Sequence, residues 1–99
     1  MFFLEVATME RWLSNAKLDR FVRRAVTRTP DTGIKPIAAM VQHLLSAEGT
    51  VRPCQMLPDE DWVYASLSRL IKKGIIEKYV HESTGGIRYR VSAYPREQR

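Results

Sequence analysis

Apolar residues recur at three- and four-residue intervals in two long stretches of the first half of the chain. The first stretch covers residues 8–28, and its register slips by about one residue near Ser14 and Asn15, where we expect a kink or a short break. The second covers residues 36–47 and ends just before Gly49, a residue type that commonly stops a helix. Both stretches are predicted to be amphipathic helices, separated by a cluster of turn residues at 29–33.

The second half of the chain begins with short elements. Residues 50–52 are compatible with a very short strand, and residues 53–57 with a helix of about two turns at most, because Pro58 prevents its continuation. A third amphipathic helix is predicted to begin at Asp59 or Glu60 and to end at Lys73, before Gly74.

The last segment changes from helical to alternating periodicity. Residues 75–82 are rich in β-branched and aromatic side chains, residues 83–86 form a glycine-containing turn, and residues 87–92 alternate apolar and polar positions. This pattern predicts a β-hairpin, with Tyr79 and His81 on its outward face. In its second strand we expect Ile87, Tyr89 and Val91 to face inward, and Arg88, Arg90 and Ser92 to face outward.

The composition is that of an intracellular globular domain. Hydrophobic residues make up 44% and charged residues 27% of the 99 positions, which argues against disorder. Cys54 is the single cysteine, so no internal disulfide can form, and with His43 and His81 it matches no zinc-ligand spacing. The apolar start is short and interrupted by Glu5, and no segment approaches the roughly 20 apolar residues of a membrane span. We therefore expect a cytoplasmic protein without a membrane partner.

The net charge of +5 is unevenly distributed along the chain. Residues 1–33 carry six basic and four acidic residues, residues 34–60 two and three, and residues 61–99 eight and four. The basic excess therefore lies in the last third and, more weakly, in the first helix. This asymmetry suits a polyanionic partner.

Residues 67–77 pass from the end of a predicted helix through Gly74 into a predicted strand. This segment resembles a known family. The order of helix, short strand, short helix, turn, helix, glycine and hairpin over residues 34–92 resembles the winged helix-turn-helix DNA-binding domain. The resemblance implies an α+β, mainly α fold: a three-helix core with a C-terminal β-hairpin wing and an extra N-terminal helix. Residues 1–33 would be that extra helix, residues 34–92 the winged helix-turn-helix domain, and residues 93–99 a flexible tail.

In this family the second helix of the motif enters the major groove and the wing contacts the neighbouring backbone. Carried over by position, the side of helix 60–73 that faces away from Val63, Leu67 and Leu70 would face the groove. One departure is a group of carboxylates at 59–61, which would repel phosphate; it can cap the helix, accept a hydrogen bond from cytosine, or indicate a protein partner. The resemblance implies DNA contacts by Tyr64, Ser68, Arg69, Lys72, Arg88 and Arg90.

The N-terminal helix is not needed by a minimal winged-helix core. We expect it to pair with its copy in a homodimer through Leu4, Trp12 and Phe21, while packing against helix 36–47 of the same chain is the alternative. Its opposite face is either solvated or turned toward phosphate. That face carries Arg11, Arg20, Arg23, Arg24 and Arg28.

Enzymatic chemistry has little support in the sequence. There is no glycine-rich phosphate loop and no nucleophile–base pair at suggestive spacing, so we expect no enzyme, no cofactor and no small-molecule substrate.

The expected function is sequence-specific binding of double-stranded DNA by a small, repressor-like, dimeric transcriptional regulator. The alternative is a winged-helix protein-interaction module, such as an adaptor, an assembly subunit or an inhibitor of a nucleic-acid enzyme, which Trp62, Tyr64 and the acidic helix start favour. Binding of RNA or single-stranded DNA would need aromatic residues on an open sheet, and only Tyr79 qualifies.

Overall fold

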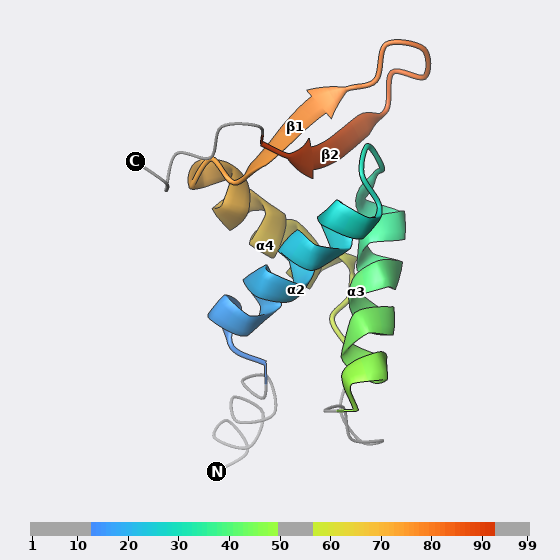
Figure 1. Cartoon of the computed structure of the whole chain (residues 1–99). Helices are drawn as coiled ribbons and strands as arrows, with labels where there is room; N and C mark the ends of the chain where they lie inside the picture. The colour runs from blue at the N-terminus through green and yellow to red at the C-terminus, as the bar shows by residue number, and fades with distance from the viewer. Residues whose placement is uncertain (1–12, 50–56, 93–99) are drawn as a thin grey trace.

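The computed structural model describes residues 13–49 and 57–92. Three helices pack together, and two strands form an antiparallel hairpin at one end of them (Figure 1). The described part of the chain is therefore mainly helical with a small sheet, which confirms the α+β, mainly α part of the predicted fold. In chain order the elements are α2 (Asn15–Arg28), α3 (Ile34–Glu48), α4 (Glu60–Lys72), β1 (Ile76–Val80) and β2 (Ile87–Val91).

Side-chain caps determine where two of the helices begin. The hydroxyl of Ser14 accepts a hydrogen bond from the backbone N–H of Lys17 at 3.2 Å, which caps α2. The carboxylate of Asp59 accepts one from the N–H of Trp62 at 3.0 Å, which caps α4. Each cap satisfies an N–H group that has no partner within its helix. The irregularity predicted near Ser14 is thus the start of α2, and the predicted start of the helix at residue 8 lies outside the described residues.

Glycines follow α3 and α4, as expected. Gly49 follows α3 with a φ of 75°, and Gly74 follows the C-terminal turn of α4 with a φ of 76°. This left-handed conformation costs little only for a residue without a Cβ atom. At Gly74 it reverses the chain so that Ile75 and Ile76 enter the core that α4 has just covered, which fixes the hairpin to the helices.

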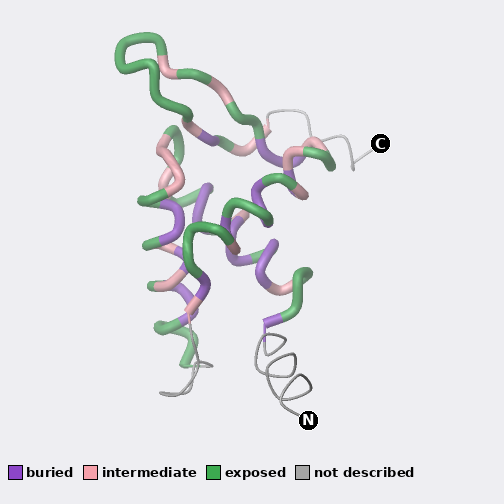
Figure 2. The backbone as a smooth tube through the Cα atoms, turned by 180° about the vertical axis from the view of Figure 1, so that it is seen from behind, coloured by how far each residue is buried: buried purple, intermediate pink, exposed green. Residues whose placement is uncertain are grey.

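A single apolar core joins α2 to the other two helices. Figure 2 shows buried positions on the sides where the helices face one another and exposed positions along the outer part of the hairpin. This packing corrects the division at residue 33: α2 is one of the core helices and packs against α3 and α4 of its own chain. Phe21, expected in a dimer interface, is only 4% exposed within that core, while Leu4 and Trp12 lie outside the described residues. Fully buried members of the core include Val22, Val26, Ile37, Val41, Leu45, Val63 and Leu67.

The segment between α2 and α3 pairs with the hairpin. Thr32 forms an isolated antiparallel bridge with Tyr89 of β2: Tyr89 donates its N–H to the Thr32 carbonyl at 2.9 Å, and Asp31 donates to the Tyr89 carbonyl at 3.0 Å. The sequence predicted only a turn here and placed its short strand at 50–52, which, with the short helix at 53–57 and the tail at 93–99, lies outside the described residues. This pairing attaches the hairpin to the segment between α2 and α3, in addition to its connection to α4 through Gly74.

The hairpin has one face on the helices and one away from them. Its register pairs Ile76 with Val91 and Val80 with Ile87, so Ile76, Tyr89 and Val91 share one face. Tyr89 is buried there and Val91 is half-buried, as predicted. Ile87 is 48% exposed despite lying on the same face, because the outer part of the hairpin extends beyond the helices (Figures 1 and 2).

Candidate nucleic-acid interface

One side of α4 is open to solvent along its whole length. Tyr64 is 52% exposed, and Ser68 and Lys72 are also exposed, whereas Val63 and Leu67 on the other side are fully buried. This is the face that the 100° rotation per residue predicts, since positions 64, 68 and 72 lie within one narrow arc. Asp61 and Ala65 are exposed on the same side. Three of the six predicted DNA-contacting residues therefore lie together on one helix face.

Arg69, the fourth predicted contact, is half-buried and paired with an acidic residue of α2. Its Nη2 lies 2.7 Å from Oδ1 of Asp19 on α2, and its Nε lies 3.1 Å from both carboxylate oxygens. Ser66 donates its hydroxyl to the same Oδ1 at 2.6 Å. Asp19 is only 8% exposed, so these charge-assisted hydrogen bonds satisfy a carboxylate that would be costly to bury alone. The structure thus gives Arg69 a role in joining α4 to α2.

The position of Asp19 in the sequence already indicated this ion pair, although the sequence prediction did not use it. Asp19 lies one turn before Val22, within the apolar arc of the first helix, whereas an unpaired carboxylate is almost never fully buried. Such a position requires a cation from another element. Among the described residues, no buried side-chain nitrogen or oxygen lacks a hydrogen-bond partner.

The two hairpin arginines lie on the face of the sheet that points away from the helices. In the register, Arg90 lies opposite Glu77 and Arg88 lies opposite Tyr79, which confirms that Tyr79 shares the outward face. Nε of Arg90 donates to Oε2 of Glu77 at 2.9 Å, and its guanidinium carbon lies 4.5 Å from the centre of the Tyr79 ring. Arg88 donates from Nη1 to the backbone carbonyl of Asp31 at 2.8 Å. The structure therefore does not bring these arginines together with Tyr64 and Lys72 on a single cationic face.

Asp31 is the centre of this outward cluster. Besides the bond from Arg88 to its carbonyl, its carboxylate accepts a hydrogen bond from the hydroxyl of Tyr79. That hydrogen bond is the main reason why the pKa of Tyr79 is raised, and the hydrogen bond to Glu77 raises the pKa of Arg90. Asp31 has a φ of 59°, a left-handed conformation in which Asp and Asn are the usual non-glycine residues. The cluster holds the α2–α3 turn against the hairpin.

Tyr89 connects the open side of α4 with the inner face of the hairpin. Burial raises the pKa of Tyr89, and Tyr64 lies close enough to raise it further. Lys78 lies directly opposite Tyr89 in the register and is exposed, and beyond it Val80 and Ile87 are 62% and 48% exposed. Exposed lysines therefore lie at the end of α4 and on β1, and exposed apolar side chains lie on the outer part of the hairpin.

The remaining candidates from the sequence have ordinary surroundings. His43 is exposed on α3, and Nδ1 of His81 lies 3.2 Å and 3.3 Å from the hydroxyls of Ser83 and Thr84. Trp62 packs partly buried against the core. Within residues 13–49 and 57–92 there is no group of three metal-binding side chains; Cys54 lies outside them.

Comparisons with known proteins add no relative to this geometry. No protein-family model, no curated protein and no solved structure matches the chain significantly. In the part of the chain that the structure describes, the helices are too short or too polar to cross a lipid bilayer.

Proposed function

We propose that this chain binds double-stranded DNA through a winged-helix arrangement, as a small transcriptional regulator of the repressor type. In this proposal the open side of α4 enters the major groove, and the exposed outer part of the hairpin contacts the neighbouring backbone. Tyr64 and Ser68 would contact bases or phosphates, and Lys72, Lys73 and Lys78 would contact phosphates.

The observation that carries the proposal is the pairing of Thr32 with Tyr89. With it, the described elements follow the order helix, short strand, helix, helix and hairpin, which resembles the winged-helix pattern beginning at α2 rather than at residue 34. The last helix of that order has one side open to solvent, and basic residues gather at its C-terminal end. A homodimer that reads two half-sites is part of the proposal, and the burial of Phe21 leaves its interface to be located.

Salt dependence of duplex binding tests the lysines of this surface. Each phosphate contact contributes about 0.9 to the slope of log K against log salt, so Lys72→Gln should lower the slope by about that amount and weaken binding to all sequences. Lys35→Gln is the matched control because it removes the same charge from an exposed position on α3. Fluorescence anisotropy with a labelled duplex at several salt concentrations measures both. Equal slopes for the two variants would contradict the assignment of α4.

The same assay decides what the hairpin arginines do. The sequence predicted that Arg88→Ala with Arg90→Ala flattens the salt dependence, which requires contacts to phosphate. Because both side chains have intramolecular partners, we expect the slope of the double variant to fall by less than about 1, with a modest loss of thermal stability. A fall of about 1.8, which corresponds to two lost phosphate contacts, would instead establish the hairpin arginines as DNA contacts.

A protein-interaction module is the second candidate, and a specific surface favours it. Tyr64, Val80 and Ile87 are the large hydrophobic side chains that remain exposed among the described residues, and Glu60 and Asp61 make the start of α4 acidic. Exposed aromatic and aliphatic side chains are typical of protein interfaces. An absence of any duplex binding at micromolar protein and low salt would favour this candidate over DNA binding.

A further inference from the structure

Helix α2 carries a second basic surface, formed by Lys17, Arg20, Arg24 and Arg28. We infer that this row binds the phosphate backbone of a second duplex segment, so that one molecule bridges two segments of DNA. The inference rests on the proposed function for its first segment, which α4 would hold.

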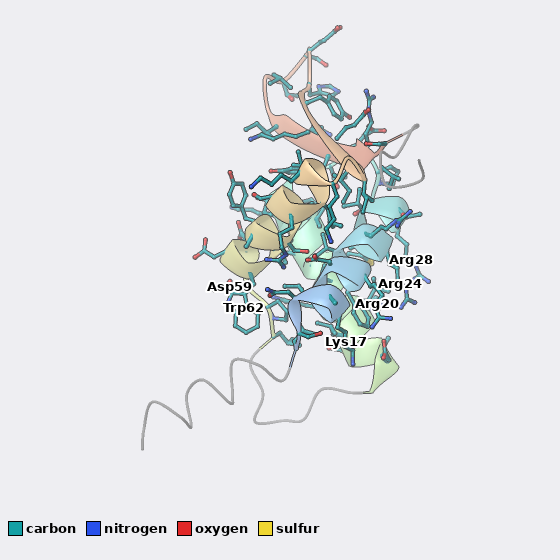
Figure 3. All side chains as sticks on the ribbon, turned by 90° about the vertical axis from the view of Figure 1, so that its left-hand side faces the viewer. Lys17, Arg20, Arg24, Arg28, Asp59 and Trp62 are labelled. Carbon is teal, nitrogen blue, oxygen red and sulfur yellow. The ribbon has the colours of Figure 1, made fainter. Side chains whose placement is uncertain are left out.

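The four side chains lie in one straight row. Their spacing of three, four and four residues confines them to an arc of about 80° on the helix, over a length of about 16 Å. Arg20, Arg24 and Arg28 are exposed, and Lys17 is half-exposed. Figure 3 shows the row on the side of α2 that faces away from α4, whose start is marked by Asp59 and Trp62. The row and the open side of α4 therefore belong to different faces of the molecule.

Within residues 13–49 and 57–92, no acidic side chain forms an ion pair with the row. Helix α2 contains five basic residues and one acidic residue, Asp19, and that carboxylate is turned inward to Arg69 and Ser66. Among the described residues, neither Lys17, Arg20 nor Arg28 has an ion pair. The guanidinium carbon of Arg24 lies 5.4 Å from the centre of the Phe21 ring.

This arrangement works against the stability of the helix. Like charges three and four residues apart repel each other, whereas an ordinary solvated helix face gains from alternating acidic and basic residues at these spacings. A duplex backbone relieves the repulsion, because it presents about one negative charge per 1.7 Å along its axis, which is a denser row than the one on α2. Three of the four cations are arginines, whose planar fork matches phosphate oxygens. An evenly spaced linear row favours a regular polyanion over an acidic peptide.

A bridging assay tests the inference. A biotinylated duplex on beads is incubated with protein and then with a fluorescent duplex, and the captured fluorescence reports bridging. The test variant is Lys17→Gln with Arg20→Gln and Arg28→Gln, which leaves Arg24 on Phe21 and keeps residues that favour helix. The control is Arg20→Lys with Arg28→Lys, which keeps the charges of the row.

We expect the wild-type protein and the lysine control to capture the second duplex, and the glutamine variant to capture roughly tenfold less at moderate salt, since it loses about three phosphate contacts. Binding of a single duplex, measured by anisotropy, should stay near the wild-type affinity in the glutamine variant. Light scattering should give all three proteins the same molecular mass.

The other outcomes separate this inference from the proposed function. If the glutamine variant captures as much second duplex as the wild type, the inference of a second DNA-binding surface is overturned. It is also overturned if the wild type binds a single duplex but never captures a second one. Neither result affects the proposed role of α4. A change of mass in the glutamine variant assigns the row to self-association and also overturns the inference. If wild type binds no duplex at all, both proposals fail. If the glutamine variant loses single-duplex binding while Lys72→Gln keeps it, the row is the primary site, and both the bridging inference and the role of α4 are overturned.

Discussion

Helix α2 and the β1–β2 hairpin both carry arginines at regular intervals along one face, but the fold treats the two sets of charges differently. On the hairpin, Arg90 contacts Glu77 and Tyr79, and Arg88 donates to the carbonyl of Asp31. On α2, the row of Lys17, Arg20, Arg24 and Arg28 has no ion pair among the described residues. The spacing of residues locates a charge on a face. Whether that charge is available to a ligand depends on which acidic groups the fold brings beside it.

The largest expected effect concerns the buried side of α2. The basic row has a defined position on the protein only if this buried side packs in the core. Phe21→Ala should lower the free energy of unfolding by about 3 to 5 kcal/mol, since it empties a site that is 4% exposed and also removes the ring under Arg24. Urea denaturation followed by circular dichroism measures the loss. A variant that keeps its stability but changes its mass in light scattering would show that Phe21 belongs to a dimer interface, as the sequence first predicted.

A second test compares a partnered cation with an unpartnered one. Asp19→Ala leaves Arg69 without its carboxylate and Ser66 without its acceptor, so we expect a loss of about 2 to 3 kcal/mol in the free energy of unfolding. The cost stays below that of a fully buried pair, because the Arg69 side chain is 33% exposed and can reach water.

The matched change on the row is Arg20→Gln. It removes a charge with no acidic partner and relieves repulsion from Arg24, so its effect on unfolding should stay within about 0.5 kcal/mol. Denaturation curves of the two variants under the same conditions measure the difference. Equal losses would mean that Arg20 has a structural role comparable to that of Arg69, and the distinction between the two regions would not hold.

The sequence predicted those features that depend on local periodicity. The helices at 36–47 and 60–73, their glycine ends and the alternation in the hairpin appear in the structure because each follows from spacing and from single residues such as Gly49 and Gly74. The exposed side of α4, with Tyr64, Ser68 and Lys72, followed from the same rotation per residue. These properties require no knowledge of what each helix packs against.

Features that depend on contacts between distant segments were missed. The bridge from Thr32 to Tyr89 and the ion pair from Asp19 to Arg69 join residues about fifty or more positions apart, and neither has a local pattern. As a result, α2 was assigned outside the core, and Arg69 was expected to be free. An acidic residue inside an apolar arc, as at Asp19, was the one local signal of such a contact.

The smallest expected effect concerns the hairpin network and reports whether it forms in solution. The hydrogen bond to Asp31 raises the pKa of Tyr79 above its ordinary value of 10.0, which means that the folded state favours the protonated phenol. The contribution of this bond to stability is therefore complete below pH 10 and is lost as the pH rises through the raised pKa. Asp31→Asn removes the charge and tolerates the left-handed conformation at this position, so it should lower the pKa of Tyr79 toward 10. Residue-specific NMR titration measures this change, with Tyr89 as an internal control because burial is the main cause of its own raised pKa. If the pKa of Tyr79 does not change in Asp31→Asn, the hydrogen bond between Tyr79 and Asp31 does not form in solution, and it does not restrain the hairpin.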